Sequence, residues 1–193
     1  MEQLKNEKLT VTISAHGAEL QSIKNAEGRE YLWQGDEKYW PRRSPLLFPI
    51  VCGLWKDEYR VDGRTFNLPR HGFARDMDFE VVDKSDTSVT YTLESSPETR
   101  EVYPYDFELD VTYILNDDAI SVIWSVKNTG KQEMHFQIGG HPAFNLPGVA
   151  EGDKMHGSIL FDNVEPLTRI IGNTGGCIKP ERYELKTDRQ VWN

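Results

Sequence analysis

The chain has few cysteines, no long apolar run and no excess of positive charge, and each shortage excludes a class of protein. Its 193 residues include two cysteines, Cys52 and Cys177, which are too few for a disulfide scaffold and have no zinc-site spacing. No apolar leader opens the chain, and no apolar run approaches the roughly 18 residues that span a bilayer. A net charge of −9 leaves no basic face for phosphates. We therefore expect a cytoplasmic protein that binds neither nucleic acid nor a membrane.

Apolar and polar residues alternate with a period of two along much of the chain, which predicts antiparallel strands. The alternation is clearest in FELDVTYIL (residues 107–115), and it returns in AISVIWSVK (residues 119–127) and in shorter form at residues 9–13 and 89–93. The polar links at residues 116–118 and 62–63 are typical of hairpin turns.

Helical signals are almost absent. One short helix is predicted in SSPETREVY, where Ser96 is the expected cap and Pro97 occupies the first helical position. The glycine-rich stretch IIGNTGGCIKPERY (residues 170–183) is interpreted as a surface loop. Many short strands joined by turns predict an all-β fold, an antiparallel β-sandwich or barrel.

The C-terminal stretch TDRQVWN has neither a turn signal nor a polar tail that would close a domain. We therefore expect a single β-sandwich domain over residues 1–193 that is truncated at its C-terminus. An uncovered edge of such a sandwich predicts a homodimer or poor solubility.

Two of the five histidines stand apart from the rest. His71 lies in RHGFARD and His141 in GGHPAFN, each at a predicted strand end or loop. A neighbouring glycine leaves the backbone free to make a tight turn, and the proline after His141 restricts it. Two neutral imidazoles suit proton transfer near pH 7 to and from the oxygens of a polyhydroxylated ligand. The pattern alone leaves open whether the two act together. No H-E-x-x-H or G-x-S-x-G motif is present.

Six motifs occur in an order that resembles the aldose 1-epimerase (mutarotase) family, and in particular its LacX-like bacterial branch. They are GAELQSI, EYLWQGD, YWPRRSPLLFPIV, RHGFARDMDFEV, YPYDF and IGGHPAFNLP. The resemblance implies the galactose mutarotase-like supersandwich and the interconversion of α and β anomers of free aldoses such as galactose and glucose. It implies no metal and no organic cofactor, because a base and an acid open and reclose the sugar ring.

The resemblance also implies roles for individual residues. By position, His141 matches the general acid to the ring oxygen, and His71 matches a second histidine that holds or polarises the sugar. The residues that would bind the substrate or line its pocket are Arg42, Phe73, Arg75, Phe144 and Asn145.

Two departures from the family pattern limit this assignment. Gly53 stands where relatives carry an arginine near the sugar hydroxyls. The glutamate that acts as general base lies in a C-terminal strand of the family, and the 193 residues contain no such segment. Asp76, Asp78 and Asp106 are interpreted as solvated or ion-paired rather than as replacement bases.

Two other functions remain open on the sequence. A non-catalytic carbohydrate-binding module would keep the histidine pocket and lack the base. A hexose-6-phosphate 1-epimerase would need cations for the phosphate, and Arg42, Arg43, Arg70 and Arg75 supply a local excess of positive charge near the key motifs.

Overall fold

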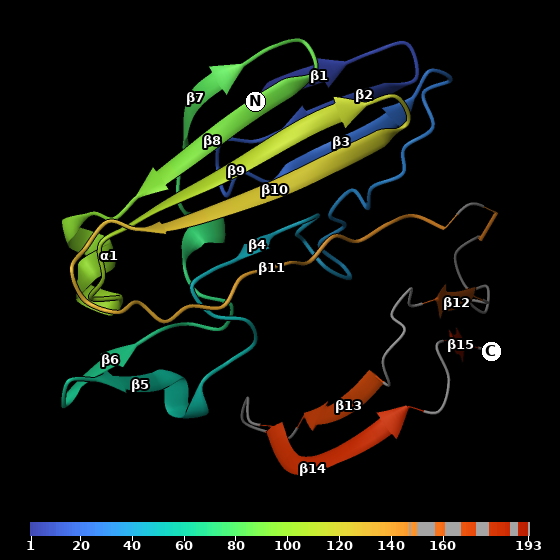
Figure 1. Cartoon of the computed structure of the whole chain (residues 1–193). Coiled ribbons are helices and arrows are strands. Elements are labelled where there is room, and N and C mark those ends of the chain that lie inside the picture. The colour runs from blue at the N-terminus through green and yellow to red at the C-terminus, as the bar shows by residue number, and fades with distance from the viewer. Residues whose placement is uncertain (147, 150–156, 161–166, 173–177, 186–188, 193) are drawn as a thin grey trace.

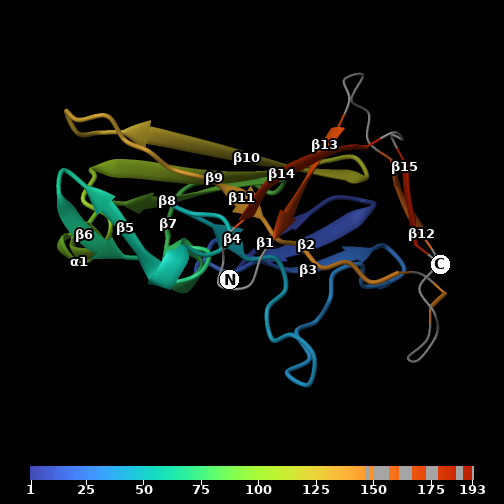
Figure 2. The same ribbon diagram turned by 90° about the horizontal axis from the view of Figure 1, so that it is seen from below.

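The computed structural model describes residues 1–146, 148–149, 157–160, 167–172, 178–185 and 189–192, and its regular structure is mostly antiparallel strand. Two sheets face each other across the main core (Figures 1 and 2). The first sheet has the order β1 (Glu2–Lys5), β2 (Leu9–Ile13), β3 (Leu20–Asn25). The second has the order β10 (Ala119–Asn128), β9 (Phe107–Asn116), β8 (Ser88–Glu94), β7 (Glu80–Lys84). The predicted all-β sandwich is confirmed.

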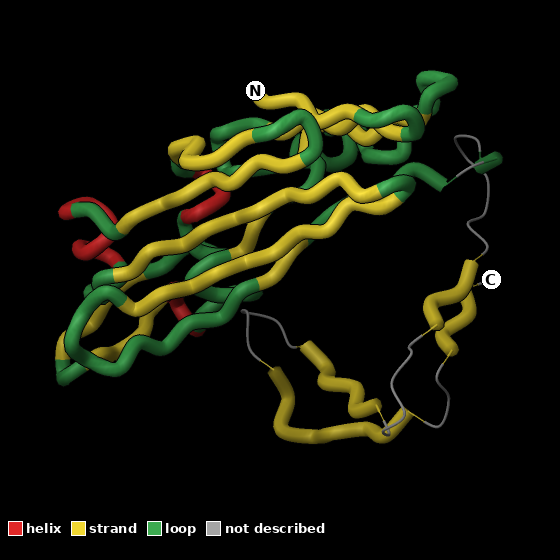
Figure 3. Tube along the Cα trace, turned by 45° about the horizontal axis from the view of Figure 1, so that its top comes forward, coloured by secondary structure: helices red, strands yellow, loops and turns green. Residues whose placement is uncertain are grey.

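The other elements are short pairs and single turns (Figure 3). The pairs are β4 (Leu46–Leu47) with β11 (Gly139–Gly140), β5 (Glu58–Val61) with β6 (Arg64–Asn67), β12 (Gly157–Leu160) with β15 (Arg189–Trp192), and β13 (Leu167–Gly172) with β14 (Ile178–Leu185). The helices are α1 (Pro97–Val102) and the 3₁₀ turns η1 (Trp55–Asp57) and η2 (Ala74–Asp76).

The alternating residues of β2, β8 and β9 form the core, as their sequence pattern predicts. In β9 every second side chain from Phe107 to Leu115 is buried. Tyr113 of this strand crosses the core, and its hydroxyl donates a hydrogen bond to the carbonyl of Ala18 at 2.7 Å. The hydrogen bond satisfies the one polar group of a buried ring and joins the two sheets.

Strand β10 has the predicted alternation but not the burial of β9. Val122 lies opposite Tyr113 of β9, and Trp124 lies opposite Val111, so their side chains share the core-facing side of the sheet. They nevertheless remain 39% and 38% exposed. β10 is an edge strand, and Ile120, Val122 and Trp124 line an open cavity together with Leu20 and Ile23 of β3.

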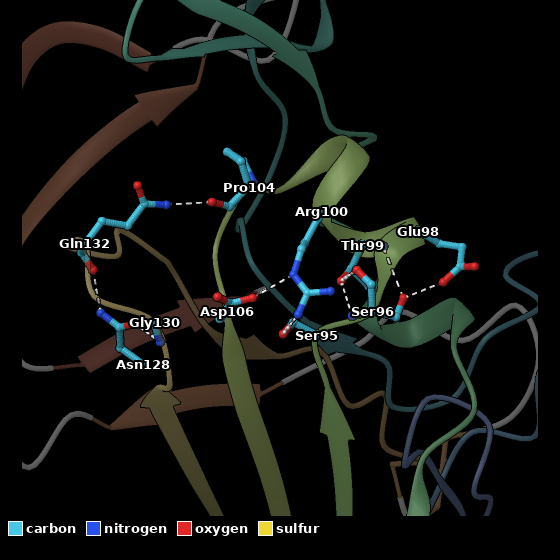
Figure 4. Close-up of polar contacts among 10 residues, drawn as sticks. All are labelled: Ser95, Ser96, Glu98, Thr99, Arg100, Pro104, Asp106, Asn128, Gly130 and Gln132. Atoms are coloured by element: carbon cyan, nitrogen blue, oxygen red, sulfur yellow. Dashed lines mark hydrogen bonds and ion pairs between the residues drawn. The ribbon is translucent and has the colours of Figure 1, made fainter.

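The predicted turns and the predicted helix are confirmed. Two-residue turns join β9 to β10 and β5 to β6, and Asp62 and Gly63 have φ values of 48° and 77°. Ser96 caps α1 by accepting a hydrogen bond from the amide of Thr99, and Pro97 is the first helical residue (Figure 4). The helix has six residues, less than two turns.

The connection that follows β10 is tied to the corner between α1 and β9 (Figure 4). The side-chain amide of Gln132 donates to the carbonyl of Pro104 at 2.6 Å, and Asn128 donates to the carbonyl of Gln132 at 2.7 Å. Arg100 and Asp106 pair at 2.6 Å in the same corner. These contacts direct the chain back toward β11 and the segment that carries His141.

The glycine-rich stretch at residues 170–183 was wrongly interpreted as a loop at both of its ends. Residues 170–172 end β13, and residues 178–183 belong to β14. The β-branched and aromatic residues Ile170, Ile171, Ile178 and Tyr183 favour strands here despite the neighbouring glycines. Residues 173–177 lie outside the described part of the chain. In that part, no helix has both the length and the apolar character needed to cross a membrane.

Candidate active site

The backbone fixes His71 at a tight turn. His71 and Gly72 both have a φ of 71°, in the left-handed region, and Gly72 forms a parallel bridge with Phe48. A Cβ on Gly72 would lie 2.2 Å from the carbonyl oxygen of Phe48, so only glycine fits. The amide of Phe73 then donates to that same carbonyl at 3.0 Å.

The ring of His71 has a defined tautomer because it accepts a backbone hydrogen bond. The amide of Cys52 donates to Nδ1 at 3.0 Å, and the amide of His71 donates to the carbonyl of Cys52 at 2.8 Å. A backbone N–H can only donate, so neutral His71 carries its proton on Nε2. The ring therefore presents an N–H donor on the side away from Cys52.

Burial and neighbouring positive charge hold the pKa of His71 below its usual value. Partial burial is the largest cause, and the charges of Arg75, Arg70, His141 and Arg42 act in the same direction. His71 is therefore a neutral imidazole near pH 7, and its Nδ1 can keep accepting from Cys52.

His141 arrives on an extended segment that lies between two other parts of the chain. On one side, its amide donates to the carbonyl of Pro45 at 3.1 Å, and the amide of Ala143 donates to Arg43 at 2.9 Å. On the other side, the amide of Trp33 donates to Ala143 at 2.9 Å, and Asn145 donates to Tyr31 at 2.8 Å. Pairing on both edges fixes the backbone of residues 141–145.

The rings of His71 and His141 lie close together, a point that the sequence pattern alone leaves open. Their ring centroids lie 6.1 Å apart with an interplanar angle of 64°. Trp40 lies on another side of His141, with centroids 5.1 Å apart and an angle of 44°. Two imidazoles at this separation can both reach one small polar molecule.

Three arginines lie near His71, and one carboxylate bridges two of them. Nη2 of Arg42 lies 2.6 Å from one oxygen of Asp76, and Nε of Arg75 lies 3.4 Å from the other. Arg75 also donates to the carbonyl of Arg70 at 2.8 Å. Burial, followed by the charge of Arg42, lowers the pKa of Arg75 from its usual high value, and the guanidinium stays charged.

The three aspartates considered as replacement bases are ion-paired or solvated, as predicted. Asp76 pairs with Arg42 and Asp106 with Arg100, and the exposed Asp78 lies 2.8 Å from Nδ1 of His16. Only Asp76 lies beside the arginines of the site. Among the residues that the structure describes, no group of three or more His, Cys, Asp or Glu side chains is arranged to hold a metal ion.

Three other residues named from the resemblance make their contacts elsewhere. Phe73 packs into an aromatic cluster, with its ring 6.2 Å from Phe48 and 6.1 Å from Phe107. Phe144 is 59% exposed. Asn145 donates its side-chain amide to the carbonyl of Leu32 at 2.9 Å, which anchors the His141 segment.

Phe144 faces away from the histidines because side chains alternate along an extended segment. It lines an open, mostly apolar cavity of about 470 Å³, together with Gly140, Pro142, Trp124 and residues of β3. The structure thus brings together His71, His141, Arg42 and Arg75, and places Phe144 on the opposite face.

Sequence reasoning missed two contributors to the site. The ring of Trp40 contacts His141, and the backbone of Cys52 fixes His71. Trp40 lies in the motif YWPRRSPLLFPIV, so the sequence did contain a signal for it. The backbone contact of Cys52 has no signature in the sequence.

Comparison with known proteins places these features in a family. The family model described as aldose 1-epimerase matches residues 2–160. A chromosomal LacX protein of Lactococcus lactis is 41% identical over 171 residues, which are 84% of this chain and 56% of that protein. An Escherichia coli protein whose name provisionally assigns it as a glucose-6-phosphate 1-epimerase is 28% identical over 107 residues, which are 53% of this chain and 35% of that protein.

Solved structures agree with the family match. A galactose mutarotase-related enzyme from Lactobacillus acidophilus superposes with a TM-score of 0.92 at 36% identity, covering 100% of this chain and 65% of that one. A galactose mutarotase-like protein from Lactobacillus casei gives 0.91 at 36% identity, covering 100% and 67%. The chain thus spans 56% of the length of the LacX relative and 65% of the L. acidophilus chain.

Proposed function

The chain belongs to the aldose 1-epimerase family, and on that premise we propose that its histidine site binds a free aldose such as galactose or glucose and interconverts its anomers. The observation that carries the proposal is the pair of imidazoles 6.1 Å apart, because one is a fixed N–H donor and the other is open to solvent. A hemiacetal presents two oxygens, the ring oxygen and the anomeric hydroxyl, to such a pair.

In the proposed reaction His141 is the general acid. It donates a proton to the ring oxygen while a base removes the proton of the anomeric hydroxyl, and the bond between the anomeric carbon and the ring oxygen breaks. The open aldehyde rotates and the ring recloses on its other face, which returns both protons. His71 donates its Nε2 hydrogen to a sugar oxygen and polarises it.

The general base has no candidate at the pair among the described residues, because Asp76 is engaged by Arg42 and Arg75. A positioned general base contributes about 10²- to 10⁴-fold in rate. We therefore propose that this chain accelerates anomerisation about 10²- to 10⁴-fold less than it would with such a base. Arg42 and Arg75 are proposed to bind sugar hydroxyls with their remaining N–H groups.

A specific observation favours a second candidate substrate, a hexose 6-phosphate. The positive charges of three arginines lower the pKa of His71: Arg42, Arg70 and Arg75. Among the described residues, Asp76 is the carboxylate that pairs with Arg42 and Arg75. Such a surplus of guanidinium groups suits a phosphate. Comparison of glucose with glucose 6-phosphate decides between the two: a preference of tenfold or more in kcat/KM for the phosphorylated sugar would replace the free aldose.

Polarimetry of fresh α-glucose and α-galactose tests the proposed function. The chain is expected to accelerate mutarotation above the buffer rate, and His141→Ala is expected to remove that acceleration. Equal rates with and without protein would overturn the proposal. If calorimetry then showed specific sugar binding, the site would be a non-catalytic carbohydrate-binding module.

The exposed free thiol of Cys52 suits the reducing cytoplasm, where we propose that the protein acts.

A further inference from the structure

His141 differs from His71 in how its ring is held. Within the described ranges, neither ring nitrogen of His141 has a hydrogen-bond partner, and its ring neighbours are Trp40 and His71. The side chain is also solvent-exposed. Since the backbone of the segment is paired on both edges, the remaining freedom of His141 is rotation of its side chain.

Trp40 lies in a loop built around that segment. The amide of Trp33 and the carbonyl of Arg43 both bind Ala143, so the chain between them passes from one edge of the His141 segment to the other. This connection projects from the molecule between β3 and β4 (Figure 2). The tryptophan is thereby held beside His141 although the two are far apart in sequence.

The loop carries its own supports, which make Trp40 a fixed neighbour. The indole N–H of Trp33 donates to the carbonyl of Trp40 at 2.8 Å, and the amide of Trp40 donates to Asp36 at 2.9 Å. Gly35 has a φ of 73°, and a Cβ there would lie 2.9 Å from the carbonyl oxygen of Pro41. The loop therefore closes tightly on itself just before and just after Trp40.

We propose that Trp40 is a positioning residue for His141: the indole restricts the imidazole to the orientation that reaches the sugar ring oxygen. The inference rests on the proposed function, since it concerns the same proton transfer. Tilted contacts between aromatic rings are favourable at this distance. A general acid delivers its proton only from a narrow range of positions, and a displacement of about 1 Å can cost about 10²-fold in rate.

Three variants test the role of Trp40. Trp40→Ala removes the ring, and Trp40→Phe keeps an aromatic face. Trp55→Ala is the matched control, because Trp55 is 61% exposed and has no ring contact among the described residues. Anomer exchange measured by NMR gives kcat and KM, and the ring-proton shifts of His141 report whether its contact with residue 40 persists.

The expected result is a loss of about 10- to 100-fold in kcat for Trp40→Ala, with KM within about threefold of wild type. Trp40→Phe should restore most of kcat, and Trp55→Ala should match wild type. The His141 ring signals should move in Trp40→Ala, while those of His71 should stay in place.

Several results would overturn the inference. If Trp40→Ala keeps the kcat of an active wild type, or loses affinity alone, Trp40 does not position His141 and the proposed function still stands. If the wild type itself gives no acceleration, the proposed function and the inference fall together. Should Trp40→Ala not fold by circular dichroism, Trp40→Leu against Trp40→Phe decides: equal kcat values in the two would contradict an aromatic positioning role.

Discussion

The turn that carries His71 and the segment that carries His141 meet at one site but hold their imidazoles in different ways. The backbone of Cys52 makes two hydrogen bonds to His71, one of them to the ring itself. His141 has a fixed backbone, and its ring is bounded by Trp40 and His71. A ring held by hydrogen bonds keeps one tautomer, whereas a ring held by packing can still exchange protons on both nitrogens.

This difference suits the two proposed roles. A group that polarises a hydroxyl acts best with a permanent donor in a fixed direction, which His71 provides. A general acid must lose and regain a proton in each turnover, so a bond to the backbone at one nitrogen would restrict it. Substitutions at the two histidines and at the residues that hold them can break this contrast.

The largest effect is expected from the two histidines themselves. His141→Ala should abolish the protein-dependent rate, since a general acid is worth about 10²- to 10⁴-fold. His71→Asn should lose only about tenfold, because asparagine tolerates a positive φ and can accept from Cys52, and it removes one hydrogen bond to the sugar. Polarimetry of both variants measures this. A greater loss in His71→Asn than in His141→Ala would reverse the assigned roles.

The turn beneath His71 should be highly sensitive to one added methyl group. Gly72→Ala combines a left-handed backbone with a contact of 2.2 Å to Phe48, and should lower the free energy of unfolding by roughly 2–5 kcal/mol. Gly63→Ala is the control, since Gly63 has a φ of 77° with no atom within 4 Å of its Cβ position. Gly63→Ala should lower the free energy of unfolding by about 1 kcal/mol. Urea unfolding that gave equal losses would contradict the close approach at Gly72.

A smaller effect is expected where the His141 segment is anchored. Asn145→Ala removes the hydrogen bond to Leu32 and should cost about 1 kcal/mol in urea unfolding. Asn67→Ala is the matched control, because the side-chain amide of Asn67 in β6 donates to the carbonyl of Asp57 in η1 at 3.3 Å. Asn145→Ala should lower kcat, and Asn67→Ala should leave it unchanged. If Asn145→Ala changed only KM, Asn145 would bind the sugar directly instead of anchoring the His141 segment.

The smallest effect concerns pH. The folded-state pKa of His71 lies below the usual value of about 6.5, so the unfolded chain binds a proton more readily than the folded one as pH falls below about 6.5. The contribution of His71 to stability is therefore present above that pH and is lost as pH falls toward the folded-state pKa. Urea unfolding between pH 7 and pH 5 should show the loss, and His71→Asn should reduce it.

The charge contribution to this shift can be separated by mutation. Arg70→Gln should raise the pKa of His71, because it removes one of the positive charges that lower it, and Arg64→Gln serves as a distant control. An NMR titration of His71 reads the shift directly. A lower pKa in Arg70→Gln would contradict the electrostatic explanation.

The strands were predictable from sequence because their alternation is local, but burial was not. β9 and β10 have the same period, and their residues pair one to one. Alternate residues of β9 are buried, whereas Val122 and Trp124 of β10 border an open cavity and stay partly exposed. The facing layer decides burial, and no pattern within β10 reports it. The interpretation of residues 170–183 as a loop was wrong for the converse reason. Local turn residues suggested a loop, although both ends of the stretch belong to strands.

The site was predictable where side chains carry the signal. The motifs predict His71, His141, Arg42 and Arg75 as site residues, and the structure places them near one another. Phe144, predicted for the same pocket, lines a different cavity because side chains alternate along the extended segment. Trp40 was missed because its contact with His141 depends on strand pairing over about a hundred residues of sequence.

The most direct test of the central claim, that His71 and His141 form one sugar site, is an NMR titration of the histidine ring signals with galactose. The account predicts that the signals of His71 and His141 shift together with a single dissociation constant. Those of His16, which is bound to Asp78, and of exposed His135 should stay in place. Shifts in only one histidine of the pair, in neither, or in His16 or His135 instead would contradict it.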